Sequence, residues 1–145
     1  MFGEWNNLIG NEKTKYDVKY AFNKTEVAYD FSIVEKRNAT VKAAELVTNN
    51  SYQIDPKTVG TAIKGYTGKT KGLGIVLLVE KFDKTEELAS VFVTYFDIAG
   101  RKVLLTERVS AKPVGFGFRN YWAGAIAKIL KDCHNKTAGW EASAK

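Results

Sequence analysis

Residues 73–110 read LGIVLLVEKFDKTEELASVFVTYFDIAGRKVLLTERVS, and this stretch decides the fold class. Two apolar runs, 73–82 and 88–97, are separated by a short polar segment, and a turn containing glycine leads into a third run at 102–110. Loops this short allow antiparallel pairing only, since a parallel crossover needs about a dozen residues or more. The stretch therefore predicts a three-strand antiparallel meander with 88–97 in the centre, because that run is apolar on both faces.

A helix that begins near Arg119 is predicted after the meander. Apolar residues recur there at helical spacing, and they are Trp122, Ala125, Ile126, Ile129, Leu130 and Cys133. This spacing places them in one stripe, which we expect to pack on the sheet. Residues 134–145 show no period beyond Trp140, so they are predicted to form a frayed tail.

The segments before the meander give weaker signals. A short helix is predicted at 2–9, within a chain end, about 1–12, that is expected to fray. Residues 16–22 and 27–33 alternate apolar and polar side chains, which predicts a hairpin around the Asn-Lys pair that separates them. Residues 36–50 fit no element, because a weak helical period there is interrupted by β-branched residues.

Asp55-Pro56 predicts the start of another helix, with a capping carboxylate followed by proline at the first helical position. Glycines and lysines follow it as a loop that leads into the meander. The sequence thus predicts one α+β domain spanning 1–145. Its antiparallel or mixed sheet is centred on the meander, with two or three helices packed on it.

Composition narrows the classes of function. The chain has 145 residues, of which 45% are hydrophobic and 26% charged, as in an ordinary globular domain. Its net charge of +6 permits an anionic partner without demanding one, because the lysines are spread along the chain. No apolar run approaches the roughly 18 residues of a membrane span. Gly68-Lys69-Thr70 lacks both the earlier glycine and the strand–loop–helix order of a phosphate-binding P-loop.

Catalytic and metal-binding signals are weak. Cys133 and His134 are the only cysteine and histidine. On a helix these neighbours diverge by about 100°, so they cannot act as a nucleophile–base pair. Cys133 completes the apolar stripe, which favours a buried thiol. We therefore expect no enzyme activity, no metal and no cofactor.

One local segment is a candidate binding site, and its residues are Gly115, Phe116, Gly117, Phe118, Arg119, Asn120 and Tyr121. A cation at a helix start costs roughly 0.3–1 kcal/mol unless something offsets it. Arg119 either pairs with Glu107 or another acid, lies over an aromatic ring, or binds an anion beside free backbone N–H groups. The anion would be a phosphate, a carboxylate or an acidic peptide, walled by the aromatic residues. Gly124 marks a place where a partner backbone could approach closely.

The same segment resembles the RNP1 motif of RNA-recognition domains. Gly115, Phe116, Gly117, Phe118 and Tyr121 fit that motif, whereas Val114 and Arg119 replace its basic and aliphatic positions. Residues 91–93 resemble the partner motif RNP2. The resemblance implies a sheet whose aromatic side chains stack on bases. Only a strand lies between the two motifs here, although the family has a helix and a strand.

A second resemblance covers residues 72–132. This segment is similar to the core of small Gram-negative envelope lipoproteins, such as the amino-terminal domain of the Tol translocation protein and the curli-secretion lipoprotein. The shared features are apolar strands, a closing helix, and a hairpin that contains Phe96, Asp97, Val103 and Leu104. Their lipid-bearing cysteine is missing. The resemblance implies a non-catalytic assembly role, in the periplasm or envelope in preference to the cytoplasm, with an unknown protein or an anionic ligand as partner. A basic nucleic-acid-binding domain is the alternative.

Overall fold

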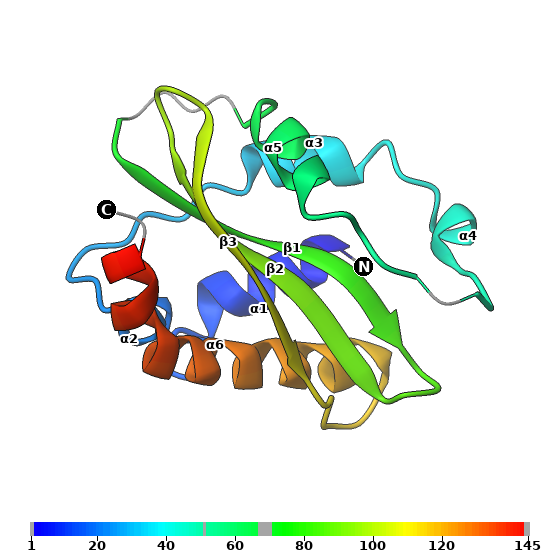
Figure 1. Ribbon diagram of the computed structural model, residues 1–145. Coiled ribbons are helices and arrows are strands. Elements are labelled where there is room, and N and C mark those ends of the chain that lie inside the picture. Colours follow the sequence, from blue (N-terminus) through cyan, green and yellow to red (C-terminus); the bar gives the residue numbers. More distant parts are fainter. Residues whose placement is uncertain (1, 51, 67–70, 144–145) are drawn as a thin grey trace.

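The computed structural model describes residues 2–50, 52–66 and 71–143, which form one sheet with helices on both faces (Figure 1). Strands β1 (Leu73–Asp83), β2 (Leu88–Asp97) and β3 (Lys102–Ala111) pair antiparallel throughout, in the order β1-β2-β3. The predicted α+β class, the meander and the central position of β2 are confirmed. The sheet is antiparallel and not mixed.

Strand β2 is buried on both faces because each face carries its own hydrophobic core. Val91, Val93 and Tyr95 belong to the core beneath the C-terminal helix. Phe92 and Phe96 point the other way and pack in a second core. This alternation follows from the two-residue period of a strand.

The first face is covered by α6 (Phe118–Ser143), together with α1 (Phe2–Asn11) and α2 (Val18–Ala21). The predicted stripe of α6 is buried, including Trp122, Ile129 and Cys133. The chain end predicted to fray at about 1–12 is instead helical from residue 2 to residue 11. Trp5, Leu8 and Ile9 of α1 pack against the first core, which fixes the helix on the sheet side of α6.

The predicted frayed tail is also wrong, since α6 continues to Ser143. Thr137 lies four residues after Cys133 and extends the buried stripe by one turn. Its hydroxyl oxygen is 2.8 Å from the carbonyl oxygen of Ala21 and 2.9 Å from that of Cys133. A polar residue is tolerated there because its hydroxyl is hydrogen-bonded.

The predicted N-terminal hairpin does not form. The Asp17 carboxylate accepts a hydrogen bond from the Tyr20 N–H (3.0 Å) and begins the single turn of α2. Asn23 has a φ of 50°, and the Lys24 N–H donates to the Lys19 carbonyl at 2.9 Å. Such an arrangement ends a helix, so the residues expected to form a hairpin turn close α2 instead.

Residues 27–33 do not form the second strand of that hairpin either. Asp30 accepts hydrogen bonds from the Ser32 N–H (3.0 Å) and the Ser32 hydroxyl (2.6 Å), and α3 (Ser32–Asn38) begins at this point. Further along, α4 (Ala43–Leu46) is a single turn on an arm that projects from the molecule (Figure 1). Leu46 and Val47 are 55% and 80% exposed on this arm and belong to none of the hydrophobic cores of the described residues, which explains the weak sequence signal there.

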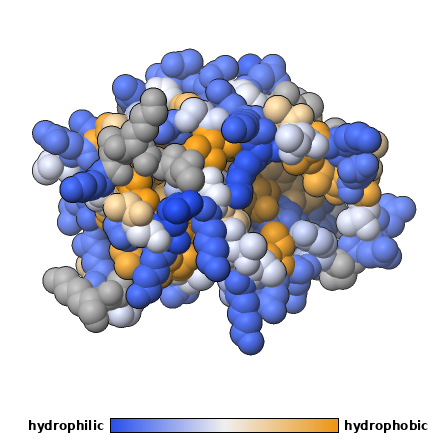
Figure 2. All heavy atoms as spheres, turned by 90° about the horizontal axis from the view of Figure 1, so that it is seen from above, coloured by the Kyte–Doolittle hydropathy of each residue, from blue (hydrophilic) through white to orange (hydrophobic). Residues whose placement is uncertain are grey.

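The second face is covered by α3 and by α5 (Lys57–Ile63). Helix α5 follows Asp55-Pro56 as predicted, and the Asp55 carboxylate accepts from the Lys57 N–H at 3.0 Å. Figure 2 looks onto this side and shows hydrophilic side chains surrounding smaller apolar patches. Residues 67–70, including the rejected P-loop segment Gly68-Lys69-Thr70, lie outside the described residues.

An ion pair between a buried carboxylate and a partly exposed arginine holds the segment before α5 against the sheet. The side chain of Glu80 is 1% exposed and accepts hydrogen bonds from Arg108 (Nε 3.1 Å, Nη2 2.9 Å), the Ser90 hydroxyl (2.8 Å) and the Ile54 N–H (2.8 Å). Arg108 also donates to the Ile54 carbonyl at 3.1 Å and lies over the Phe92 ring. Every oxygen of the buried carboxylate is therefore satisfied.

Candidate functional site

The candidate residues lie where β3 passes into α6. Gly115 to Gly117 form a loop, and the remaining four residues form the first turn of the helix. The Val114 N–H donates to the Tyr121 carbonyl (3.2 Å), and the Tyr121 N–H donates to the Gly117 carbonyl (2.9 Å). Gly115 and Gly117 have φ values of 129° and 77°, which strongly favour glycine. The loop is thus folded back against the helix start.

The three aromatic side chains of the segment differ in their surroundings. Phe116 is 96% exposed and lies in none of the hydrophobic cores of the described residues. The Phe118 ring is 5.9 Å from that of Trp5, and the Tyr121 ring is 5.0 Å from that of Trp122. Two of the aromatic residues therefore contribute partly to packing, whereas Phe116 is exposed to solvent.

Arg119 follows neither of the expected structural alternatives. None of the ion pairs or cation–π contacts of the described residues involves its guanidinium, and Glu107 is not its partner. Its Nε donates to the Asn120 side-chain oxygen (3.3 Å), and its carbonyl accepts from the Trp5 indole N–H (3.0 Å). Within the described ranges, the backbone N–H groups of residues 118–120 meet no acceptor. Anion binding at this helix start stays a prediction.

At Gly124 the sequence predicted a close approach by a partner's backbone, and the protein's own backbone occupies that place instead. A Cβ atom at this position would overlap the carbonyl oxygen of Val114. The close backbone approach that we assigned to a partner is therefore an internal contact, which holds the loop before α6 against the helix.

Beside this contact lies a groove of about 270 Å³, which is lined by Thr14, Lys15, Val114, Gly124, Ala127, Lys128 and Lys131. We call it the lysine groove. No carboxylate lines it, and none of its three lysines forms an ion pair with another described residue. Val114 and Ala127 are its apolar lining residues. The result is a small surface that combines positive charge with apolar side chains, and Val114 stands two residues before the exposed Phe116.

Our sequence interpretation missed the lysine groove, although part of its signal was present. Gly124, Ala127, Lys128 and Lys131 are spaced as i, i+3, i+4 and i+7, which places them on one face of α6. This face adjoins the apolar stripe. Lys15 comes from the opposite end of the chain, so only the folded arrangement adds it to the groove.

The sheet does not offer the aromatic platform that the RNP1 resemblance implies. Residues 115–121 form a loop and a helical turn and not a strand. On β2, Phe92 and Phe96 are 2% and 6% exposed, because α5 and the segments around it cover them. Bases cannot stack on side chains that are already buried.

Cys133 and His134 both pack within the fold. Cys133 is fully buried, and this burial raises the pKa of its thiol to about 12. The His134 ring stacks on Tyr20 with centroids 3.7 Å apart, and its Nδ1 is 2.7 Å from the Tyr20 carbonyl oxygen. Across 2–50, 52–66 and 71–143, no group of three or more His, Cys, Asp or Glu side chains is arranged to hold a metal ion.

Among the described residues, none of the helices has the length and apolar character needed to cross a membrane. Comparison with protein-family models, with curated proteins and with solved structures gives no match for this chain.

Proposed function

We propose that this protein is a non-catalytic binding domain, and that loop 112–118 and the lysine groove bind an acidic segment of a partner protein. The observation that carries this proposal is the near-complete exposure of Phe116 (96%) beside a groove that contains three lysines and no carboxylate. Val114, which is 54% exposed, belongs to the loop and also lines the groove.

The chemistry of the surface fits such a segment. Aromatic side chains that enter a partner's pocket often dominate the binding energy of an interface. Lysines around an apolar centre attract acidic side chains, raise the association rate and select against basic partners. An acidic peptide with one apolar residue would place that residue on Val114 and Ala127 and its carboxylates near Lys128 and Lys131.

A protein segment is favoured over nucleic acid by two features. Nucleic-acid binders without sequence preference usually combine a basic groove with several stacking aromatic side chains. In the described part of this chain the aromatic side chains of β2 are buried, and Phe116 is the one nearly fully exposed aromatic residue among those whose exposure is given. The lysine groove is also small, and its apolar lining residues Val114 and Ala127 suit a side chain better than a phosphate backbone.

A peptide-display screen of random 12-residue peptides tests the proposal directly. We expect enriched peptides to be acidic and to contain an apolar or aromatic residue. Their affinity should fall at least tenfold in Lys128→Glu/Lys131→Glu, in the single variant Lys128→Glu and in Phe116→Ser. It should be unchanged in Lys102→Glu, a charge reversal on β3 that matches the single variant. Enriched peptides without acidic bias, or affinity unaffected by these variants, would refute it.

The same variants distinguish the nucleic-acid alternative. The measurement is the retention of the protein on an immobilised single-stranded oligonucleotide. If retention falls steeply with salt and is lost in Lys128→Glu/Lys131→Glu, the groove binds nucleic acid and the peptide proposal is wrong. The resemblance of residues 72–132 to envelope lipoprotein domains supports a partner in the bacterial envelope. Recovery of the native protein in the cytoplasmic fraction of its own cells would contradict a partner in the envelope.

A further inference from the structure

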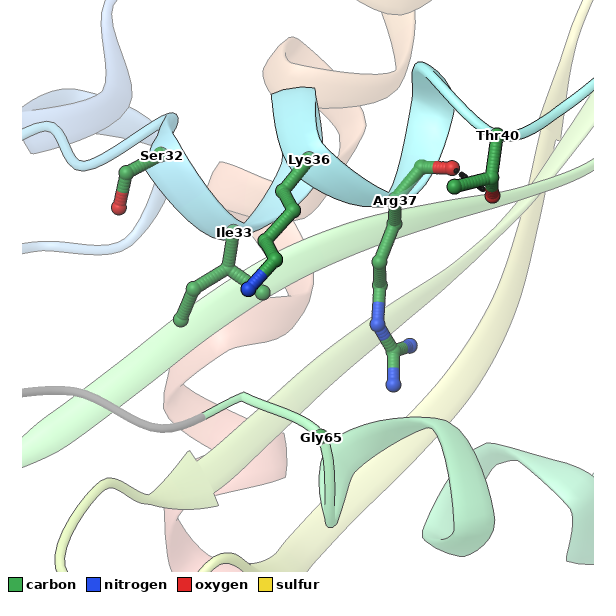
Figure 3. A pocket seen from close by; sticks show the side chains of 6 residues that line it. All are labelled: Ser32, Ile33, Lys36, Arg37, Thr40 and Gly65. Atoms are coloured by element: carbon green, nitrogen blue, oxygen red, sulfur yellow. Dashed lines mark hydrogen bonds between the residues drawn. The ribbon is translucent and has the colours of Figure 1, made fainter.

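A second hollow lies on the other face of the sheet, between α3 and the residues that follow α5 (Figure 3). It has a volume of about 420 Å³ and is lined by Ser32, Ile33, Lys36, Arg37, Thr40 and Gly65. Ligand pockets commonly start at about 300 Å³. In Figure 3 the Arg37 side chain extends from α3 toward Gly65 at the end of α5, and the Lys36 side chain points to the same side of α3 with its amine near Ile33.

The Arg37 guanidinium is held in place before any ligand arrives. Its central carbon lies 5.1 Å from the centroid of the Tyr66 ring, in a cation–π contact. Gly65 provides the space for it, because a Cβ atom at Gly65 would overlap the guanidinium. An arginine fixed in this way loses less conformational entropy when it binds than a free surface arginine does.

The donors of this arginine are unused. Within the described residues, the Arg37 side chain donates no hydrogen bond and joins no ion pair, and the Lys36 ammonium joins none either. The hydroxyl groups at the rim already donate elsewhere, Ser32 to Asp30 (2.6 Å) and Thr40 to the Arg37 carbonyl (2.8 Å). No carboxylate lines the hollow.

A third cation lies close to the end of α5. Arg101, from the turn between β2 and β3, donates through Nη1 to the carbonyl of Lys64 at 3.4 Å, directly before Gly65. Cations that lie close together repel one another, and a bound dianion relieves that repulsion. The planar guanidinium matches two oxygens of a phosphate at once, which a lysine cannot do.

We infer that this hollow binds a phosphate group carried by a small organic molecule. Arg37 is the bidentate donor, Lys36 supplies a second positive charge, and the apolar side chain of Ile33 contacts the group that carries the phosphate. The site is independent of the lysine groove, since it lies on the opposite face of the sheet and shares no residue with it.

The test is a titration of the isotope-labelled protein with inorganic phosphate and with phenyl phosphate, followed by NMR at constant ionic strength. We expect saturable shifts of the Lys36, Arg37, Gly65 and Tyr66 amides, and tighter binding of phenyl phosphate because its ring reaches the apolar wall. Shifts that do not saturate, or that sodium chloride reproduces, would overturn the inference.

Variants separate a built site from a general effect of charge. Arg37→Ala should weaken phosphate binding at least tenfold, and Arg37→Lys should weaken it several-fold although the charge is kept. Gly65→Ala keeps all charges and displaces the guanidinium, so it should also weaken binding. Lys128→Ala, in the lysine groove, is the control and should bind normally. Equal affinity in wild type and Gly65→Ala, with both proteins folded, would contradict the proposed geometry.

Discussion

Removing either partner of the Glu80–Arg108 ion pair should destabilise the protein, and the two losses should differ in size. The side chain of Glu80 is 1% exposed, whereas that of Arg108 is 38% exposed. Without Arg108, a carboxylate remains buried with only the Ser90 and Ile54 donors. Without the Glu80 charge, Arg108 can turn toward water.

The magnitudes follow from this asymmetry. Arg108→Met leaves an uncompensated buried charge, which typically costs about 3–5 kcal/mol. Glu80→Gln keeps the shape of the side chain and replaces one accepting oxygen by an NH2 group that faces N–H donors. The loss of charged hydrogen bonds puts its cost at about 1.5–3 kcal/mol. Glu107→Gln, an exposed neighbour of Arg108 on β3, is the control and should change stability by less than about 0.5 kcal/mol.

The pH dependence provides a second measurement. Burial raises the pKa of Glu80, but the hydrogen bonds from Arg108, the Ile54 N–H and Ser90 outweigh burial and hold the pKa below its ordinary value of 4.5. A carboxyl with a depressed pKa stabilises the fold above its unfolded pKa, and this contribution is lost as the pH falls through the folded value. The gap between wild type and Glu80→Gln should therefore shrink in acid.

Urea unfolding followed by circular dichroism, near neutral pH and in acid, measures both effects. The slope of the free energy of unfolding against urea should stay constant, so that the midpoints report stability. If Glu80→Gln costs as much as Arg108→Met, or if its deficit stays the same in acid, the buried carboxylate does not fasten the segment before α5 in the way described.

Three further predictions concern α6 and the loop before it. Gly124→Ala should destabilise the protein by about 1–3 kcal/mol, because the added Cβ overlaps the Val114 carbonyl. Thermal unfolding measures this, with Gly139→Ala as the control: its added Cβ meets no atom within 4 Å, so this variant should be more stable by up to about 1 kcal/mol. Cys133 should resist a thiol-reactive disulfide reagent while the protein is folded, since its pKa is about 12, and rapid labelling would show that the thiol is accessible. Phe116→Ser should shift the free energy of unfolding by less than about 0.5 kcal/mol, as the side chain is 96% exposed; a larger loss would mean that Phe116 packs on the fold.

The meander and the α6 stripe were predictable because their signals lie in consecutive residues. Each strand of 73–110 is long and apolar, and each loop is too short for another connection. The apolar stripe of α6 repeats over several turns. Where a pattern is long and unambiguous, tertiary contacts only reinforce it.

The N-terminal segment shows the opposite case. Residues 16–22 alternate like a strand, yet an Asp17 cap and an Asn23 stop fit a single helical turn into the same residues. Capping chemistry decides between the two readings, and it was visible in the sequence. The buried end of α6 was harder to foresee, because Thr137 extends the stripe through hydrogen bonds to Ala21 and Cys133 and not through an apolar side chain.

The candidate site was also predictable only in part. Local sequence identified the two glycines of the loop and the start of the helix, but it could not indicate which aromatic side chain stays exposed. Phe116 is 96% exposed, and Phe118, 56% exposed, lies against Trp5, which is 113 positions away in the sequence and comes from α1. The lysine groove likewise needs Lys15 beside α6. Surfaces of this kind become visible only when the N-terminal segment is placed against α6, because no pattern within either segment indicates that the two lie together.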